Sequence, residues 1–206
     1  MALTLYHYWR SSCSWRVRWA LALKGLAYES IPVNLLTAEQ LGEDYLRLNP
    51  MGHVPLLVED GWAVADSIAI IEYLDQRHPS PALLPSDPRD RAHVRRLANI
   101  VASAIQPLQN LGVMRRHDPS KVVQDEWCRH WIDKGLRAYE AIAAPKAGAF
   151  SFGDEVTMAD LCLIPQIYNA HRFQMELDDY PLCAAIYERA LNLPSCDAAA
   201  PHNQGQ

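Results

Sequence analysis

The residues best suited to chemistry stand together near the start of the chain, in Arg10-Ser11-Ser12-Cys13-Ser14-Trp15-Arg16-Val17-Arg18. They fall between a predicted strand and a predicted helix, and ligands of α/β sheets gather beyond the carboxyl ends of strands. A helix N-terminus at this place offers free N–H groups and a positive dipole end to an anion, and a serine hydroxyl can donate to a thiolate. The spacing leaves one alternative open, in which Ser11 or Ser12 only caps the helix.

Changing hydrophobic periods predict the elements that hold this stretch. Leu3 to Tyr8 is extended, Trp15 to Lys24 has a helical pattern, and Tyr28 to Val33 is extended again. About 20 residues separate the two strands, which requires a crossover and therefore parallel pairing. Gly25 follows the helix where a left-handed residue commonly ends one.

One further helix, two strands and a last helix complete the first predicted domain. They are expected over Ala38 to Leu46, Val54 to Glu59, Trp62 to Ala65 and Ile68 to Arg77. Asp60-Gly61 suits a two-residue hairpin turn between the two strands, and Asp66-Ser67 can cap the helix after them. The order βαβαββα predicts an α/β domain over residues 1–80.

A run of prolines between His78 and Pro88 predicts a linker over residues 81–90, because proline removes backbone donors and holds the chain extended. Residues 91–206 predict an all-α domain, with helices over Arg91 to about Met114, Val122 to about Ala143, Met158 to Tyr168 and near Leu182 to Leu191. Thr157 with Asp160 forms a capping-box pattern at the start of the third of these helices. Ser195 to Gln206 is polar and small, and we expect it to form a loose tail.

The composition limits the class of protein. The 206 residues are 50% hydrophobic, which supplies a core and excludes overall disorder. A sum of 19 Lys+Arg against 24 Asp+Glu gives a net charge of −5, which offers no basic field to a nucleic acid. No stretch approaches the roughly 20 apolar residues that cross a bilayer, so we expect neither nucleic-acid nor membrane partners and a cytoplasmic location. The cysteines are five and scattered, without CxxC or zinc spacing, so no metal site is expected.

Longer patterns resemble one family. Arg10 to Arg18, followed by Ala20-Leu21, is similar to the SSCxWRVRxAL motif of zeta-class glutathione transferases, the class that includes maleylacetoacetate isomerase. The further matching stretches are Asn49-Pro50-Met51 leading to Val54-Pro55, Ser67 with residues 69–74, and residues 106–111 and 153–162. The similarity runs from Leu3 to about Leu191. The serine-cysteine stretch and residues 106–111 are its most class-specific parts.

The resemblance implies a glutathione transferase fold. It consists of a thioredoxin-like N-terminal domain that binds glutathione as a cofactor and an all-helical C-terminal domain that supplies the second-substrate pocket. The resemblance also implies a homodimer. It implies that the Val54-Pro55 peptide is cis and that the Val54 backbone pairs with the cysteinyl part of glutathione, as an added strand would.

The same resemblance assigns residues to the two ends of glutathione. Asp66, where relatives usually carry Gln or Glu, and Ser67 take the γ-glutamyl end, whose carboxylate suits free helix N–H groups and whose ammonium suits an acid. His53, which stands where the class often has Gln, and Gln40 are placed at the glycyl carboxylate. An exposed loop histidine is the alternative for His53.

For catalysis, the resemblance makes Ser11 the expected donor that favours the glutathione thiolate, with Ser12 able to share that role. Cys13 belongs to the motif but need not be the attacking sulfur, and its alternative is a small packing side chain. Tyr8 is the corresponding group if the thiol is activated as in other classes of the family.

A substrate with carboxylates needs cations, because burying its charges unpaired would cost several kcal/mol. Arg10 and Arg172 are the candidates, with surface or interface salt bridges as the alternative for each. Gln109 and Asn110 are expected to line the substrate cleft or to hydrogen-bond across it.

The resulting hypothesis is a glutathione-dependent cis-trans isomerase of maleylacetoacetate or maleylpyruvate, in the catabolism of tyrosine, phenylalanine and other aromatic acids. A thiolate that adds to the cis double bond of the maleyl group leaves a single bond that can rotate, and elimination gives the fumaryl product and regenerates glutathione. One alternative is a zeta-type transferase that acts on α-haloacids or xenobiotics. The other is a glutathione-binding redox module without isomerase activity that uses Cys13 to form mixed disulfides.

Overall fold

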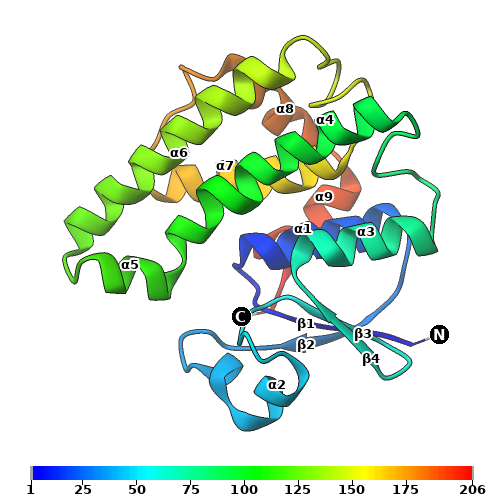
Figure 1. Cartoon of the computed structure of the whole chain (residues 1–206), viewed down its shortest axis with the longest axis vertical. Helices are drawn as coiled ribbons and strands as arrows, with labels where there is room; N and C mark the ends of the chain where they lie inside the picture. The colour runs from blue at the N-terminus through cyan, green and yellow to red at the C-terminus, as the bar shows by residue number, and fades with distance from the viewer. Residues whose placement is uncertain (1, 206) are drawn as a thin grey trace. The chain divides into compact units, whose positions relative to one another are not determined.

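Four strands in the first part of the chain form one mixed sheet (Figure 1). The structure, a computed structural model, describes residues 2–205. The strands are β1 (Leu3–His7), β2 (Glu29–Pro32), β3 (Leu56–Glu59) and β4 (Trp62–Ala65). They lie in the order β2-β1-β3-β4, with β1 and β2 parallel and the other pairs antiparallel. Both the parallel pair and the hairpin expected from the sequence are confirmed.

The helices of this part are α1 (Ser12–Leu23), α2 (Glu43–Leu48) and α3 (Ser67–Arg77), so the order βαβαββα is confirmed. α1 begins three residues before the predicted start at Trp15, because Ser11 caps it. The helix predicted over residues 38–46 is wrong as a single element. A 3-10 turn, η1 (Glu39–Leu41), and α2 replace it, because Gly42 between them has extended backbone angles, φ −68° and ψ 149°.

Positive φ angles occur at the predicted turns. Gly25 has φ +63° after α1, and the hairpin dipeptide has φ 49° at Asp60 and φ 85° at Gly61. Values above zero at both central residues suit the twist of a two-residue hairpin. These local predictions from turn chemistry are confirmed.

The expectation of a loose tail is wrong. Residues Pro194–Ala199 form α9, and Pro201–Asn203 form a 3-10 turn, η4. α9 packs along α1, and the indole Nε1 of Trp19 donates to Ser195 Oγ at 3.2 Å. Cys196 and Ala199 are buried there. α1 is consequently covered on more than one side, which is why every residue from Ser14 to Leu21 is buried and the buried residues do not form a single stripe.

The chain divides into two compact units, one comprising Met1–Ala82 with Leu193–Gln206 and the other Leu83–Asn192. Residues up to Ala82 stay with the first unit because Lys24 holds the chain after α3. Its ammonium donates to the carbonyls of His78 at 2.6 Å and Pro81 at 2.8 Å and pairs with Asp75 at 3.1 Å. The first residues of the predicted linker are therefore anchored.

The second unit is helical throughout its described length apart from turns and one isolated bridge. Its elements are α4 (Pro88–Asn99), η2 (Ile100–Ile105), η3 (Gln106–Gln109), α5 (Leu111–His117), α6 (Lys121–Ala143), α7 (Met158–Arg172) and α8 (Pro181–Leu191). The single helix predicted from Arg91 to Met114 is wrong. It passes through a π-helical stretch, η2, and a 3-10 turn, η3, because Pro107 lacks an N–H and its ring clashes with the preceding turn.

The start of α7 is held by a buried carboxylate. Asp160 accepts from the N–H of Thr157 at 2.8 Å, from Thr157 Oγ1 at 2.9 Å and from the N–H of Ser151 at 2.8 Å. The predicted capping box is therefore confirmed. Burial raises the pKa of Asp160, while these hydrogen bonds act in the opposite direction.

His7 is buried at the end of β1 between an arginine and a serine. Arg18 Nη1 lies 3.2 Å from His7 Nδ1, and His7 Nε2 lies 2.7 Å from Ser30 Oγ. Because a guanidinium can only donate, Nδ1 accepts and Nε2 carries the proton that is donated to Ser30. Burial, and then the charge of Arg18, lower the pKa of His7 from 6.5 to about 4.

This lowered pKa predicts that the first unit becomes less stable as the pH falls. Between pH 6.5 and about 4, His7 is protonated in the unfolded chain but neutral in the folded chain. The free energy of unfolding therefore falls as the pH drops through this range, by roughly 3 kcal/mol in all. In His7→Gln, whose amide can also accept and donate, the free energy of unfolding by urea should fall less steeply over this range. The exposed His53→Gln is the matched control. An unchanged acid slope in His7→Gln would contradict the assignment.

Candidate active site

The stretch singled out first begins in the turn between β1 and α1 and continues into the first turn of α1, and we call its residues 10–13 the serine turn. Ser11 has extended backbone angles, φ −69° and ψ 123°, and its Oγ accepts from the N–H of Ser14 at 3.2 Å. Its own N–H donates to the Tyr8 carbonyl at 3.1 Å. Ser11 is therefore the N-cap of α1, the alternative left open by the sequence. A hydroxyl that accepts one hydrogen bond keeps its own proton to donate, so capping and anion binding are compatible.

Ser12 and Cys13 open α1 and are both half-buried. The other cysteines are buried and form no disulfide in the described chain: Cys128, Cys162, Cys183 and Cys196. Burial raises the pKa of Cys128 to about 11 and that of Cys196 to about 12, which removes their thiolates at neutral pH. Cys13 is the one cysteine of the described chain that is not buried, which makes it the candidate for thiol chemistry.

Arg10 is half-buried, and its guanidinium lies over the ring of Trp9, 5.3 Å from the centroid. Within residues 2–205 no carboxylate pairs with it. The salt bridge considered as its alternative is thus not formed in the described chain. A cation that stacks on an aromatic ring and lacks a counter-charge is available to an anion.

Tyr8 directly follows β1 and carries a buried hydroxyl. Its side chain is 8% exposed, and its OH has no hydrogen-bond partner among residues 2–205. The backbone N–H of Tyr8 donates to Ser14 Oγ at 3.3 Å, which joins the end of β1 to the first turn of α1. Tyr8 thus has an unpaired hydroxyl donor on a residue whose backbone leads into the serine turn.

The loop before β3 carries an unpaired stretch of backbone. Val54 precedes the cis peptide to Pro55 that the resemblance implied, and neither its N–H nor its C=O is hydrogen-bonded within residues 2–205. The His53 carbonyl before it accepts from the Tyr45 hydroxyl at 2.6 Å and from Asn49 Nδ2 at 2.7 Å, which fixes the loop. The free groups of Val54 can pair with an extended peptide.

His53 and Gln40, the two candidates for a carboxylate, differ in exposure. The His53 side chain is exposed, as its alternative interpretation required. Gln40 lies in η1, and its buried Oε1 lacks a hydrogen-bond partner in the described part of the chain. Because the two ends of an amide can exchange by rotation, Gln40 is free to present its NH₂ group instead.

Asp66 and Ser67 begin α3. Asp66 has φ 75° and is its N-cap, with Oδ1 accepting from the N–H groups of Ile68 at 2.9 Å and Ala69 at 3.1 Å. Ser67 is buried, and its Oγ accepts from Arg16 Nη1 at 3.1 Å. The second carboxylate oxygen of Asp66 remains exposed to accept from an ammonium group.

Arg16 is a residue to which the sequence assigned no role. It is fully buried in α1 and links that helix to Ser67 at the start of α3. The signal was present, because Arg16 and Arg18 are charged residues within a run of otherwise apolar ones. A buried arginine needs acceptors for its donors, and the Ser67 hydroxyl accepts from one nitrogen of the Arg16 guanidinium.

In the second unit Gln109 and Arg172 belong to one network of side-chain hydrogen bonds. Arg172 Nη1 donates to Asn169 Oδ1 at 2.8 Å, and Asn169 Nδ2 donates to Gln109 Oε1. The amides of Gln109 and Gln166 exchange two bonds of 3.4 Å and 3.3 Å. Gln109 is buried, so its amide is committed to the helical core and acts on Arg172 through Asn169.

Asn110 has a different surrounding. It is half-buried at the N-cap of α5, and its Oδ1 accepts from Gln106 Nε2 at 2.8 Å. Its NH₂ group makes no hydrogen bond within residues 2–205 and can donate to a ligand. Of the predicted substrate residues, the first unit contains Arg10, and the second contains Gln109, Asn110 and Arg172.

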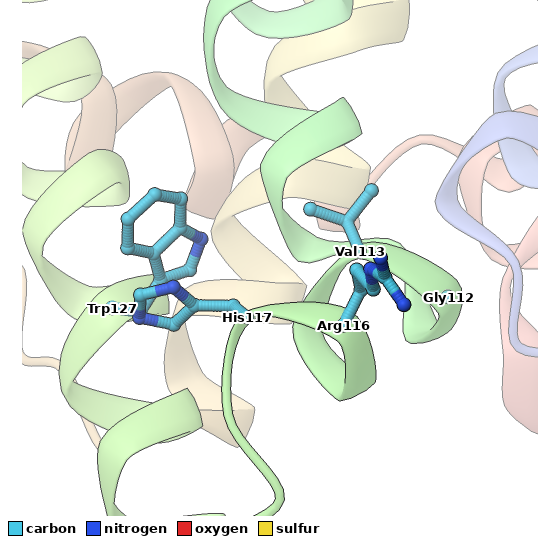
Figure 2. A pocket seen from close by; sticks show the side chains of 5 residues that line it. All are labelled: Gly112, Val113, Arg116, His117 and Trp127. Carbon is cyan, nitrogen blue, oxygen red and sulfur yellow. The ribbon is translucent and has the colours of Figure 1, made fainter.

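An open pocket of about 400 Å³ lies on α5 and α6, lined by Gly112, Val113, Arg116, His117 and Trp127 (Figure 2). The His117 and Trp127 rings stack at 4.1 Å on one side, and Val113 and Arg116 lie on the other. None of the residues expected at the active site lines it.

Among residues 2–205 there is no group of three His, Cys, Asp or Glu side chains that could hold a metal ion. The described helices include none long and apolar enough to span a membrane.

Two family models match this chain. The glutathione S-transferase N-terminal domain matches residues 10–77, and the glutathione S-transferase C-terminal domain matches residues 125–189. The mouse protein named maleylacetoacetate isomerase is 46% identical over 202 residues, which cover 97% of this chain and 93% of the mouse protein. The likeness is therefore nearly full-length.

Two solved structures are similar in fold as well as in sequence. A holo structure of maleyl pyruvate isomerase, described as a bacterial zeta-class glutathione S-transferase, has a TM-score of 0.95 and 41% identity, covering 98% of this chain and 99% of that one. Maleylacetoacetate isomerase from Anaeromyxobacter dehalogenans, solved with dicarboxyethyl glutathione and citrate in its active site, has a TM-score of 0.88 and 45% identity, covering 100% and 93%.

The Gln109–Gln166 pair predicts a non-additive pair of substitutions. Gln109→Leu leaves the buried Gln166 amide without its partner and should lower the free energy of unfolding by about 1–3 kcal/mol, and Gln166→Leu should act similarly. The double variant should lose clearly less than the sum, because it leaves neither glutamine amide facing an apolar side chain, and the Asn169 amide loses Gln109 Oε1 only once. Urea unfolding measures all three, with the exposed Gln76→Leu as the control. Additive losses would show that the two amides do not depend on each other.

Proposed function

The chain belongs to the glutathione S-transferase family, in its zeta class, and we propose on this basis that it is a glutathione-dependent cis-trans isomerase of maleylacetoacetate or maleylpyruvate. The observation that carries the proposal is the nearly full-length likeness to isomerases, one of which binds a glutathione bearing a dicarboxyethyl group. That group has the two carboxylates expected of a maleyl-type substrate.

The free polar groups of the first unit fit glutathione. The unpaired N–H and C=O of Val54 suit its cysteinyl backbone. The N-terminus of α3 suits the γ-glutamyl carboxylate, and the exposed oxygen of Asp66 suits the ammonium group beside it. The uncommitted amide of Gln40 and the exposed ring of His53 can donate to the glycyl carboxylate.

The serine turn provides the groups that favour a thiolate. When bound, glutathione supplies a thiolate that adds reversibly to an activated cis double bond, so that the bond can rotate before the thiol leaves. Ser11 donates its hydroxyl proton toward the sulfur while its oxygen still caps α1. The N–H groups of the first turn of α1 add the positive end of the helix dipole, and the Ser12 hydroxyl is a further donor at the same place.

The substrate carboxylates need cationic partners. Arg10 is the candidate in the first unit, because its guanidinium has no carboxylate partner in the described chain. Arg172 is the candidate in the second unit, held by Asn169. A guanidinium can bind a carboxylate through two parallel hydrogen bonds and can stabilise the charge that develops during addition. Asn110 is the further candidate for a polar contact with substrate, and Gln109 positions Arg172.

We further propose that the protein is a cytoplasmic homodimer, as its zeta-class membership supports. Analytical ultracentrifugation should then give twice the mass of one chain, independent of protein concentration in the micromolar range. A single species with the mass of one chain would contradict the dimer without touching the proposed activity.

The direct test is the isomerisation itself. Purified protein should convert maleylacetoacetate to the fumaryl isomer only when glutathione is present, and Ser11→Ala should lower kcat/KM about 100-fold by removing one donor to the developing thiolate. Asp87→Ala removes the corresponding cap of α4, with its bonds of 2.9 Å and 3.0 Å, and controls for the loss of a helix cap.

The outcomes separate the alternatives. No change in maleylacetoacetate or maleylpyruvate with glutathione would contradict the isomerase. Turnover of α-haloacids with glutathione, without isomerase activity, would favour the transferase. A mixed disulfide that Cys13→Ala abolishes would favour the redox module. If Tyr8→Phe, rather than Ser11→Ala, lowers turnover, the Tyr8 hydroxyl is the activating donor.

A further inference from the structure

Arg18 connects three separate parts of the first unit. It is 1% exposed in the middle of α1. Its Nε donates to the Ala199 carbonyl at 2.9 Å, and its Nη2 donates to the Trp9 carbonyl at 3.0 Å. Its Nη1 lies 3.3 Å from the Tyr8 carbonyl and 3.2 Å from His7 Nδ1. One guanidinium thus joins the end of β1, the residue before the serine turn and the last residue of α9.

These contacts bear on the serine turn because of where the carbonyls lie. Tyr8 and Trp9 directly precede Arg10, and the Tyr8 carbonyl also accepts from the N–H of Ser11. The rigid fork of the guanidinium fixes the direction of both carbonyls, and with them the path of the chain into the N-cap. The serine turn is therefore aimed by a side chain two helical turns along α1 rather than by its own residues alone.

The other end of the connection is the closing segment, residues 193–203. Ala199 ends α9, and the last carbonyls of a helix have no partner within it. Arg18 satisfies that carbonyl, and its charge suits the negative end of the helix dipole. The segment is itself fixed by the Trp19–Ser195 bond, by the buried Cys196 and Pro201, and by Asn203 Nδ2, which donates to the Asp197 carbonyl at 2.8 Å.

We infer that the closing segment and Arg18 form one positioning device for the thiolate site, in which Arg18 is the positioning residue and α9 holds its guanidinium in place. The inference rests on the proposed function, because it concerns the site at which the glutathione sulfur would be held. A guanidinium that lacked the Ala199 carbonyl would have a buried N–H without an acceptor and would lose its fixed orientation. Displacement of α9 would then loosen the serine turn, although α9 contains none of its residues.

Thermodynamic reciprocity supplies the first test on the unsubstituted chain. If the closing segment stabilises the form that binds glutathione, glutathione must stabilise the closing segment. Saturating glutathione should slow amide hydrogen–deuterium exchange in a peptide covering residues 193–203 at least threefold, while a peptide of α6 changes little. In Arg18→Lys, which cannot reach all three carbonyls with one ammonium, this slowing should disappear even at saturation.

The second test follows the thiol itself. The ultraviolet absorbance of the bound thiolate should show ionisation about one pH unit higher in Arg18→Lys and in Cys196→Phe, a tenfold loss of thiolate below that pH. Ala198→Phe places the same ring on the exposed side of α9 and should ionise bound glutathione as the unsubstituted chain does. A merely structural role would change the thermal midpoint without moving this ionisation.

The results separate this inference from the function on which it rests. Absence of glutathione binding to the unsubstituted chain would overturn both. Binding without slower exchange in the closing segment would overturn the inference alone, as would an unchanged ionisation in a folded Arg18→Lys or Cys196→Phe. If both variants fail to fold, the exchange measurement on the unsubstituted chain decides.

Discussion

The N-terminus of α1 is the constraint on which the rest of the first unit depends. The first N–H groups of a helix have no partner within it, and here Ser11 satisfies one of them while leaving its own proton free. An anion at this end is favoured by the remaining N–H groups and by the helix dipole. The site requires that β1 ends next to the N-terminus of α1. It also requires that α1 is held in a fixed position on the sheet. Burial of α1 by α3 and α9 meets the second requirement.

Buried charge is the cost of this arrangement. Arg16, Arg18 and Asp160 lie in the interior, where an unsatisfied polar group costs on the order of 1–3 kcal/mol and a charged one more. The hydrogen bonds of each link two elements: Arg16 links α1 to α3, Arg18 links α1 to β1 and α9, and Asp160 links α7 to the loop before it. An apolar side chain could fill the same space without the free-energy cost of burying a charge, but it could not orient a carbonyl or a hydroxyl.

Features encoded by neighbouring residues were predictable from the sequence. The strand and helix order follows from the change of period, the hairpin from Asp60-Gly61, and the start of α7 from Thr157 and Asp160.

The features that the sequence did not predict are mostly those that depend on contacts between distant residues. Ser195 to Gln206 has no helical period of its own, and α9 is held by packing on α1 and by the guanidinium of Arg18. Gln109 was expected to line the substrate cleft or to hydrogen-bond across it, and its partners Gln166 and Asn169 became known only from the fold. Gly42 interrupts one predicted helix through its extended backbone angles, which the apolar period does not reveal, and Pro107 interrupts another because it lacks an N–H. The family and its cofactor came from a residue motif, whereas the contacts of Arg16 and Arg18 required the structure.

The measurement that tests the central claim most directly is an experimental structure with glutathione bound. The account predicts that the sulfur lies at the N-terminus of α1, within hydrogen-bonding distance of Ser11 Oγ, with the tripeptide paired to the Val54 backbone. A sulfur held by the Tyr8 hydroxyl, one bonded covalently to Cys13, or a tripeptide bound away from α1 would contradict it.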